Sequence, residues 1–232
     1  MIPHELAKLT GSDFRLFCKR MWPAVSADPF VTGYLGLRFS LEQYLKDESR
    51  TLIDKWLNEH GPVVAMHTRG NTSTREKNFT PELEAETYKA IVGATDATIL
   101  LLDWDRRVVE GPKPRVIHLG DWHRLNLVEV AYLLNRAACM VGIDSGQLHL
   151  TEKWTNCPAL GVWFGHHPAH FSIPRPGVTH LVASSQRFKA WNRNRQASYS
   201  LQECERITGQ TIAELVRQKI SQPGIVSKNH LC

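Results

Sequence analysis

Short apolar runs alternate with longer amphipathic stretches from about residue 61 onward. The apolar runs are VVAMH (63–67), ATILLLD (97–103), CMVGID (139–144), ALGVWFG (159–165) and HLVA (180–183). The stretches between them are TPELEAETYKAIVGA (80–94), LNLVEVAYLLNRA (125–137) and GQLHLTEKW (146–154). Continuous apolar strands that alternate with helices are typical of a parallel sheet covered on both faces. The pattern predicts a Rossmann-like α/β domain.

The chain before residue 61 has a different pattern. The stretch LEQYLKDESRTLIDKWLNEHG (41–61) places apolar residues at helical spacing and ends at Gly61-Pro62, a helix stop signal. The pattern of residues 201–220 also predicts a closing helical segment, with Thr211 and Glu214 as its capping residues. We therefore expect three parts: a helical N-terminal segment (1–60), the Rossmann-like domain (61–200), and a C-terminal helix with a tail (201–232).

Composition narrows the class of protein. A chain of 232 residues with 42% apolar content can bury a sizeable core, and its net charge of +5 favours anionic ligands such as phosphates. The five cysteines are scattered and lack CxxC spacing, so neither a disulfide framework nor a zinc site is indicated. The first twenty residues do not resemble a secretory signal, and no apolar run reaches membrane-spanning length. A cytoplasmic protein without a membrane span is expected.

Ligands of such sheets bind outside the carboxyl ends of the strands. Three turns at these ends are rich in polar residues: TRGNTSTREKNF after the first strand, DWDRR after the second, and DSGQLH after CMVGI. The last of these places Asp144, Ser145, Gly146 and His149 around the start of a helix, where free N–H groups and the helix dipole favour an anion. The alternative is that Asp144 or Ser145 only caps the helix and His149 packs under the sheet.

The first turn adds a second possible phosphate contact. It carries hydroxyls at Thr72, Ser73 and Thr74 and a positive charge at Lys77, followed by a helix that starts at Pro81. Hydroxyls, a lysine and a helix terminus together can hold a phosphate, although the spacing is not that of a P-loop.

These two turns resemble the nucleotide-sugar domain of the ADP-heptose heptosyltransferases, glycosyltransferase family nine, which have the GT-B fold. The family has a hydroxyl-rich loop that ends in a lysine and an aromatic residue. Ser73, Thr74 and Lys77 match this loop, and Phe79 stands where the family usually has Trp. The resemblance covers roughly residues 61 to 185. It implies a single GT-B half that binds a nucleotide diphosphate sugar.

The family's second motif, D[TS]GxxH, matches the turn after CMVGI. Asp144, Ser145, Gly146 and His149 fill its defined positions in order. The resemblance implies that the carboxylate contacts the sugar and that the next two residues contact the phosphates. DWDRR occupies the turn that contacts the nucleoside in the family, which makes Trp104 and Asp105 candidates for the base and the ribose.

The chain also departs from the family. Family members carry a preceding Rossmann domain that binds the acceptor and supplies a catalytic Asp, whereas this chain has about sixty mostly helical residues there. The catalytic residue is therefore unknown, and the acceptor site is expected to need a partner chain or a second copy. If the chain itself supplies the base, it must lie on the N-terminal sixty residues or beside the strand ends, where the available carboxylates are Asp13, Asp28, Asp103 and Asp121. No cofactor is expected.

Two further clusters have alternative interpretations. The histidines of GHHPAHF (165–171) lack an acidic or cysteine partner at ligand spacing, so a solvated polar loop is favoured over a metal site. The basic, aromatic stretch RFKAWNRNRQ (187–196) suits either a solvated face or contact with nucleic acid. The leading hypothesis is a glycosyltransferase. The alternative is a non-catalytic nucleotide or nucleotide-sugar binding module that acts through a partner or on nucleic acid.

Overall fold

The computed structural model describes residues 44–70, 77–103, 115–164, 168, 172, 175–183 and 200–221. These residues belong to one compact unit, Phe39–Cys232. No helix within these ranges has the length and apolar character needed to cross a membrane.

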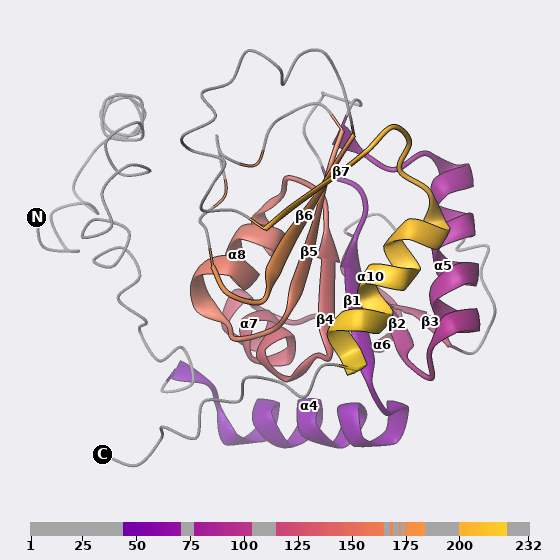
Figure 1. Ribbon diagram of the computed structural model, residues 1–232. Coiled ribbons are helices and arrows are strands. Elements are labelled where there is room, and N and C mark those ends of the chain that lie inside the picture. The colour runs from indigo at the N-terminus through magenta and orange to yellow at the C-terminus, as the bar shows by residue number, and fades with distance from the viewer. Residues whose placement is uncertain are drawn as a thin grey trace, which may run out of the picture. The chain divides into compact units, whose positions relative to one another are not determined.

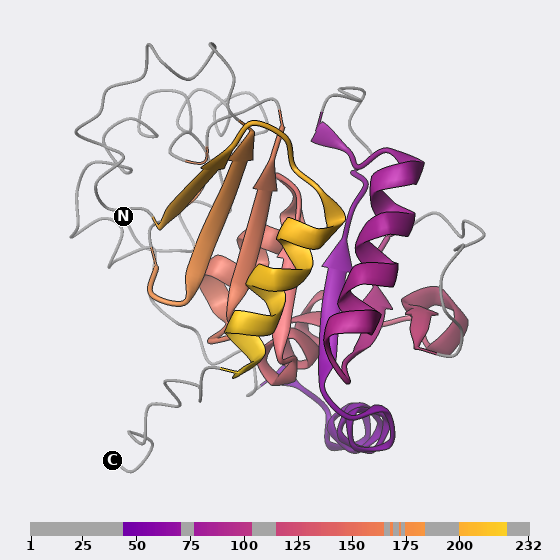
Figure 2. The same cartoon turned by 45° about the vertical axis from the view of Figure 1, so that its right-hand side comes forward.

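Seven strands of the described residues form one sheet in the order β3-β2-β1-β4-β5-β6-β7. Every neighbouring pair is parallel (Figures 1 and 2). The strands are β1 (Val63–His67), β2 (Thr98–Leu101), β3 (Val116–His118), β4 (Cys139–Gly142), β5 (Ala159–Trp163), β6 (Val178–Ala183) and β7 (Leu201–Cys204). The predicted α/β fold with a parallel sheet is confirmed. The strand order reverses its direction between β1 and β4, which makes their carboxyl ends the topological switch point.

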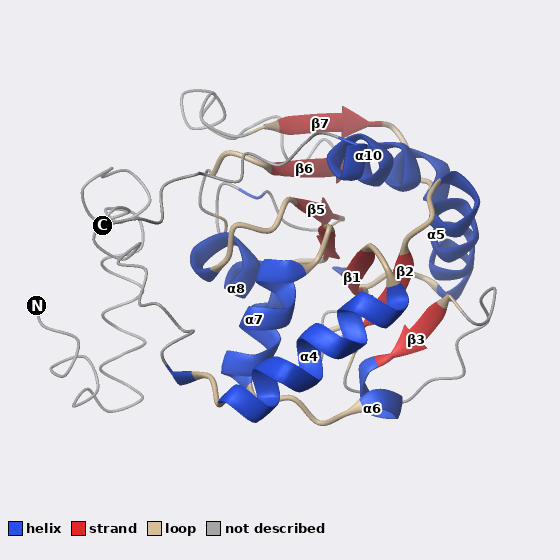
Figure 3. Cartoon of the chain, turned by 90° about the horizontal axis from the view of Figure 1, so that it is seen from below, coloured by secondary structure: helices blue, strands red, loops and turns tan. Residues whose placement is uncertain are grey.

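Helices cover both faces of this sheet, as Figure 3 shows. They are α4 (Asp47–His60), α5 (Pro81–Ala94), α6 (Leu119–Trp122), α7 (Leu127–Arg136), α8 (Gly146–Trp154) and α10 (Gly209–Ser221). One apolar cluster joins the sheet to α4, α7 and α8, and a second joins it to α5 and α10. Successive strand residues alternate between the clusters; Val63 and Ala65 of β1 belong to the first, Val64 and Met66 to the second. This alternation explains why the strands are apolar on both sides.

Local sequence signals set the ends of several helices. Helix α5 begins with Pro81 after Thr80, whose hydroxyl accepts a hydrogen bond from the Leu83 N–H at 3.2 Å. Helix α7 begins with a capping box between Asn126 and Glu129. Helix α4 ends at His60 and is followed by Gly61, which adopts φ +69°.

Helix α4 contributes Ile53, Trp56 and Leu57 to the same apolar cluster as β1 and α7. The sequence change at residue 61 thus marks the step from this helix to the first strand. The division into parts at residues 1–60, 61–200 and 201–232 stays a prediction.

The C-terminal segment differs from its prediction. Residues 201–204 were expected to be helical, but they form the parallel strand β7 beside β6. Helix α10 begins only at Gly209, and its first turn is capped by Thr208, whose hydroxyl accepts from the Thr211 N–H at 3.2 Å. Thr211 therefore lies inside the helix instead of capping it. Gly209 permits close packing, because a Cβ there would lie 2.6 Å from the backbone of α5.

Candidate functional site

The carboxyl ends of β1 and β4 lie side by side at the switch point. His67 and Gly142, the last residues of the two strands, are paired in register, and the Ile143 N–H donates to the His67 carbonyl at 3.1 Å. The turn after β1 continues through Thr68 to Gly70, and the turn after β4 leads through Asp144 into α8. The two polar turns expected from the sequence therefore occupy one edge of the sheet.

Lys77 connects these two turns. Its Nζ donates a hydrogen bond to the main-chain oxygen of Asp144 at 3.0 Å, across 67 residues of sequence. The lysine stem passes beside Gly70, since a Cβ on that glycine would lie 3.7 Å from Lys77 Cε and 3.8 Å from Ile143 Cδ1. The ammonium group consequently lies beside the turn that opens α8. Ser73 and Thr74, the other predicted residues of this loop, lie outside the described residues.

Ser145 precedes the first residue of α8 but does not cap the helix with its side chain. Its hydroxyl oxygen is buried and has no hydrogen-bond partner in the part of the chain that the structure describes. Gly146, which follows it, is exposed and has open space around its Cβ position. The first N–H groups of a helix have no partner within the helix. The start of α8 therefore carries these N–H groups and the Ser145 hydroxyl, with the Lys77 ammonium bonded to the preceding Asp144 carbonyl.

His149 lies one turn into α8, between two carboxylates. Its Nε2 is 3.1 Å from Asp144 Oδ1, and its Nδ1 is 3.3 Å from Glu152 Oε2. Burial alone would lower the pKa of His149, but the hydrogen bonds to Asp144 and Glu152 and the charges of these groups raise it to about 9. The ring is therefore a cation at neutral pH, and its side chain keeps 25% of its surface exposed. The alternative of a histidine that only packs under the sheet does not fit these contacts.

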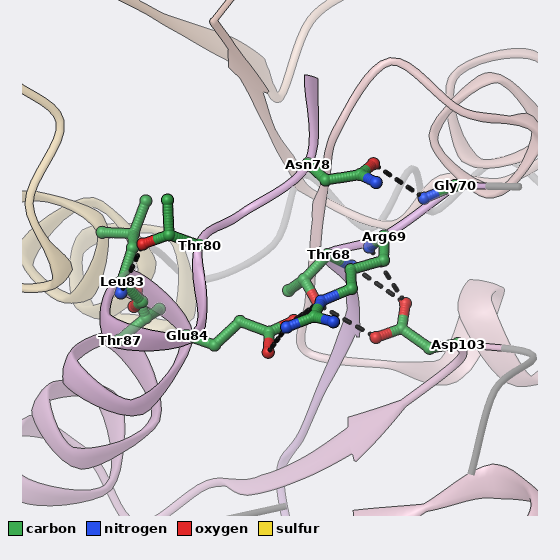
Figure 4. A network of polar contacts seen from close by, with 9 residues as sticks. All are labelled: Thr68, Arg69, Gly70, Asn78, Thr80, Leu83, Glu84, Thr87 and Asp103. Carbon is green, nitrogen blue, oxygen red and sulfur yellow. Dashed lines mark hydrogen bonds and ion pairs between the residues drawn. The ribbon is translucent and has the colours of Figure 1, made fainter. Parts of the chain in front are cut away.

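A second polar network fixes the turn after β1 (Figure 4). The Thr68 hydroxyl contacts Glu84 Oε1 at 2.5 Å and Asp103 Oδ2 at 2.9 Å, while Asp103 Oδ1 accepts from the N–H groups of Thr68 and Arg69. Arg69 forms a two-pronged ion pair with Glu84. Burial raises the pKa of Glu84, and the Thr68 hydrogen bond and the Arg69 charge oppose this effect. The network joins the turns after β1 and β2 to helix α5.

Asp103 was a candidate catalytic base, and its contacts now define its environment. The residue is 6% exposed and holds the backbone of Thr68 and Arg69. A carboxylate engaged in this way orients a turn and is poorly placed to take a proton from an acceptor. Asp121 is exposed in α6, whereas Asp13 and Asp28 lie outside the described residues, as do Trp104 and Asp105.

His67 was not identified from the sequence. It is 2% exposed at the end of β1, and neither ring nitrogen has a hydrogen-bond partner among the described residues. Its Nε2 lies 3.8 Å from Asp103 Oδ1. Burial, followed by the charge of Lys77, lowers the pKa of His67 to about 4, so the ring is neutral at physiological pH. His67 therefore adds no positive charge to that of Lys77 at this end of the sheet.

Metal ligation has no support within the described ranges, where no group of three or more His, Cys, Asp or Glu side chains is placed to hold an ion. His166, His167 and His170, and the basic stretch 187–196, fall outside these ranges.

Comparison with known proteins identifies two glycosyltransferases of similar fold. No protein-family model and no curated protein matches the sequence. The structure of E. coli heptosyltransferase WaaC with ADP matches 74% of this chain and 48% of its own, with a TM-score of 0.50 at 15% identity. A family 9 glycosyltransferase from Veillonella parvula DSM 2008 matches 75% of this chain and 53% of its own, with a TM-score of 0.54 at 14% identity. The chain thus spans about half the length of these two structures and shares their fold over that part, as the resemblance of its motifs implied.

Proposed function

We propose that this chain binds a nucleotide diphosphate sugar at the switch point and takes part in transfer of the sugar to an acceptor hydroxyl. The observation that carries the proposal is the hydrogen bond from Lys77 to the Asp144 carbonyl, which brings a cation to the start of α8. The buried Ser145 hydroxyl and the open Gly146 position stand at the same helix end. The solved structures of similar fold are glycosyltransferases, one of them with ADP.

Each part of the donor would have its own contacts. The diphosphate would lie against Lys77, the Ser145 hydroxyl and the first N–H groups of α8, with Ser73 and Thr74 completing the loop. These groups would stabilise the negative charge that develops on the departing diphosphate. Asp144 would contact a hydroxyl of the sugar, and Trp104 and Asp105 would contact the nucleoside.

Transfer also needs a base within hydrogen-bond reach of the acceptor hydroxyl. Near the switch point, Asp144 is paired with His149 and Asp103 holds the turn after β1. We therefore propose that the base comes from elsewhere, from the segment before α4 or from a partner or second copy that closes over the site. The same engagement of Asp103 is the observation that favours the second candidate function, a nucleotide-sugar binding module without catalysis of its own.

A matched pair of lysine variants tests donor binding. Lys77→Ala is expected to weaken binding of ADP or an ADP-sugar by about 1.5 to 3 kcal/mol, the size of a charge-assisted hydrogen bond. Lys89→Ala removes an exposed lysine of α5 and is expected to leave the affinity unchanged. Isothermal titration would measure both, after thermal shifts with ADP-, GDP- and UDP-sugars identify the best nucleotide. Equal affinity of parent and Lys77→Ala would remove this lysine from the site.

A separate assay addresses turnover. The purified chain is expected to hydrolyse or transfer the sugar slowly when it is alone. Rapid transfer by a monomeric preparation, abolished by replacing Asp13 or Asp28, would instead locate the base within the chain.

A further inference from the structure

A chain of buried polar side chains leads from the interior of the sheet to His149. Trp163 Nε1 is 3.0 Å from His180 Nδ1, and His180 Nε2 is 3.2 Å from Ser172 Oγ. Ser172 Oγ is 2.6 Å from Glu152 Oε1, and Glu152 Oε2 is 3.3 Å from His149 Nδ1. Trp163, His180, Ser172 and Glu152 are each at most 4% exposed. We call these four residues with His149 the buried polar chain.

Hydrogen-bond chemistry fixes the direction of every contact in the buried polar chain. The indole N–H of Trp163 can only donate, so His180 Nδ1 accepts and the neutral ring carries its proton on Nε2. That N–H donates to the Ser172 oxygen, whose own proton then goes to Glu152. Glu152 uses its second oxygen to accept from His149 Nδ1–H, which leaves His149 Nε2–H for Asp144. The buried polar chain thus fixes Glu152 Oε2 as the hydrogen-bond acceptor for Nδ1–H of His149.

A glycine beside the buried polar chain supports the hydrogen bond between Trp163 and His180 independently. Gly161 pairs with His180 in the sheet, and a Cβ at this position would lie 2.7 Å from both His180 Nδ1 and Trp163 Nε1. Real Cβ atoms do not approach other atoms so closely. The interior of strand β5 therefore lacks a side chain at the one place where it would break the first hydrogen bond of the buried polar chain.

Among the described residues, the charged groups in contact with the His149 ring are Asp144 and Glu152; Lys77 bonds the Asp144 main-chain oxygen. Asp144 lies in the turn after β4 and Glu152 on the same helix. Strands β4 and β5, which pack against α8, carry no charged side chain. The charged residues of α7 contact other partners, Glu129 with Ser49 and Arg136 with Asp54. A fully buried carboxylate is costly unless a cation accompanies it, and His149 lies 3.3 Å from Glu152.

We propose that Glu152 is a positioning residue that holds His149 as a cation with its Nε2–H aimed at Asp144. In this way the positive charge of His149 compensates the negative charge of the Asp144 carboxylate beside the diphosphate site. Without it, the carboxylate would repel the phosphates through its like charge. The inference rests on the proposed function, because it assigns His149 and Asp144 to the donor site. It concerns Glu152, Ser172, His180 and Trp163, none of which belongs to the motif that pointed to that site.

The first experiment needs no ligand. Nuclear magnetic resonance would follow the His149 ring nitrogens against pH in the parent, in Glu152→Gln and in Glu129→Gln. The parent ring is expected to titrate near pH 9. Glu152→Gln keeps the size and hydrogen-bonding capacity of the side chain but removes its charge, so the pKa of His149 is expected to fall by at least about one unit. Glu129→Gln alters an equally hydrogen-bonded carboxylate in the cap of α7 and is expected to change nothing at His149.

The second experiment measures ADP affinity between pH 6.5 and 9.5. We expect the parent affinity to decrease only as the pH approaches 9, whereas that of Glu152→Gln decreases at least about one pH unit earlier and matches the parent at pH 6.5. At pH 8.5 the difference is expected to be about 3- to 10-fold, as for a pKa change of this size. His149→Gln is expected to show no such pH dependence.

Several results would overturn the proposal. A parent His149 that titrates near 6.5 would do so, even if Glu152→Gln failed to fold. An unchanged His149 pKa in the folded variant, or an affinity loss that is uniform across pH, would also contradict it, because a purely structural role predicts a uniform loss. If ADP does not bind the parent at any pH, the proposed function fails, and the proposal for Glu152 fails with it as far as the diphosphate is concerned. In that case the magnetic resonance titration still decides whether Glu152 holds His149 charged.

Discussion

Gly161 is the residue whose substitution most directly tests the packing around the buried polar chain. A methyl group at this position would collide with the hydrogen bond between Trp163 and His180 and lie 3.1 Å from Leu148 Cδ2. Gly161→Ala is therefore expected to destabilise the fold by about 1 to 3 kcal/mol, the usual cost of overpacking a tight interior. Urea unfolding followed by circular dichroism would measure this loss.

Gly93 provides the matched control. It is the penultimate residue of helix α5 (Pro81–Ala94), and a Cβ there would meet no atom within 4 Å outside the helix backbone. Gly93→Ala is expected to stabilise the protein by up to about 0.5 kcal/mol, because alanine is the better helix former but the position lies in the last turn. If both alanine variants changed stability in the same direction, the steric interpretation of Gly161 would be wrong.

The candidate site could be predicted from sequence only where its residues stand next to strand ends. Lys77 and the Asp144 turn were expected to share an edge because parallel strands end on the same side. In the structure Lys77 Nζ lies 3.0 Å from the main-chain oxygen of Asp144. Their role in binding stays a prediction. Glu152, three positions after His149, had a detectable signal, since residues spaced i and i+3 share a helix face. Ser172 and His180 had none, because 20 and 17 residues separate them from their partners Glu152 and Trp163.

At the scale of elements, the start of α10 offers a test of which threonine caps the helix. Thr208 accepts a hydrogen bond from the Thr211 N–H, so Thr208→Ala is expected to cost about 1 kcal/mol of stability. Thr211→Ala loses only the contact between the two hydroxyls, 3.0 Å apart, and is expected to cost clearly less. Thermal unfolding of both variants would measure the difference. A larger loss for Thr211→Ala would mean that the cap lies where the sequence pattern suggested.

The missed strands show why local pattern was insufficient at the edges of the sheet. Strand β7 reads LQEC, and its two central residues are exposed, so it lacks the apolar run that identified the inner strands. Strand β3 has only three residues, two of them partly exposed. Edge strands are buried on fewer sides and tolerate polar residues. The five inner strands were predictable because both of their faces meet helices.

The strand order is a property of the whole molecule that the sequence pattern did not specify. Alternating strands and helices imply a parallel sheet, but they do not say where the chain reverses its direction along it. In the structure the reversal lies between β1 and β4, and α10 packs against α5 and α7 against α4. The switch point brings together Lys77, His67 and the start of α8.

Two histidines near this point give the whole molecule a predictable dependence of stability on pH. The pKa of His67 is lowered from 6.5 to about 4, so between these pH values the histidine is protonated in the unfolded chain but neutral in the folded chain. Folding stability is thus expected to fall by up to about 3 kcal/mol as the pH drops from 6.5 to 4. His149 has its pKa raised to about 9, so its contribution is complete below pH 6.5 and is lost as the pH rises toward 9. The two effects together favour a maximum near pH 6.5.

Urea unfolding of the parent, His67→Asn and His149→Gln at pH 4.5, 6.5 and 9 would separate these contributions. Between pH 6.5 and pH 4.5 the parent is expected to lose stability relative to His67→Asn, because asparagine does not titrate. The stability difference between parent and His149→Gln is expected to shrink at pH 9, since the histidine there loses its charge and with it the attraction of Asp144 and Glu152. Stability differences that stay constant across the three pH values would show that neither ring titrates as its surroundings require. They would contradict the interpretation that His149 is a cation between Asp144 and Glu152.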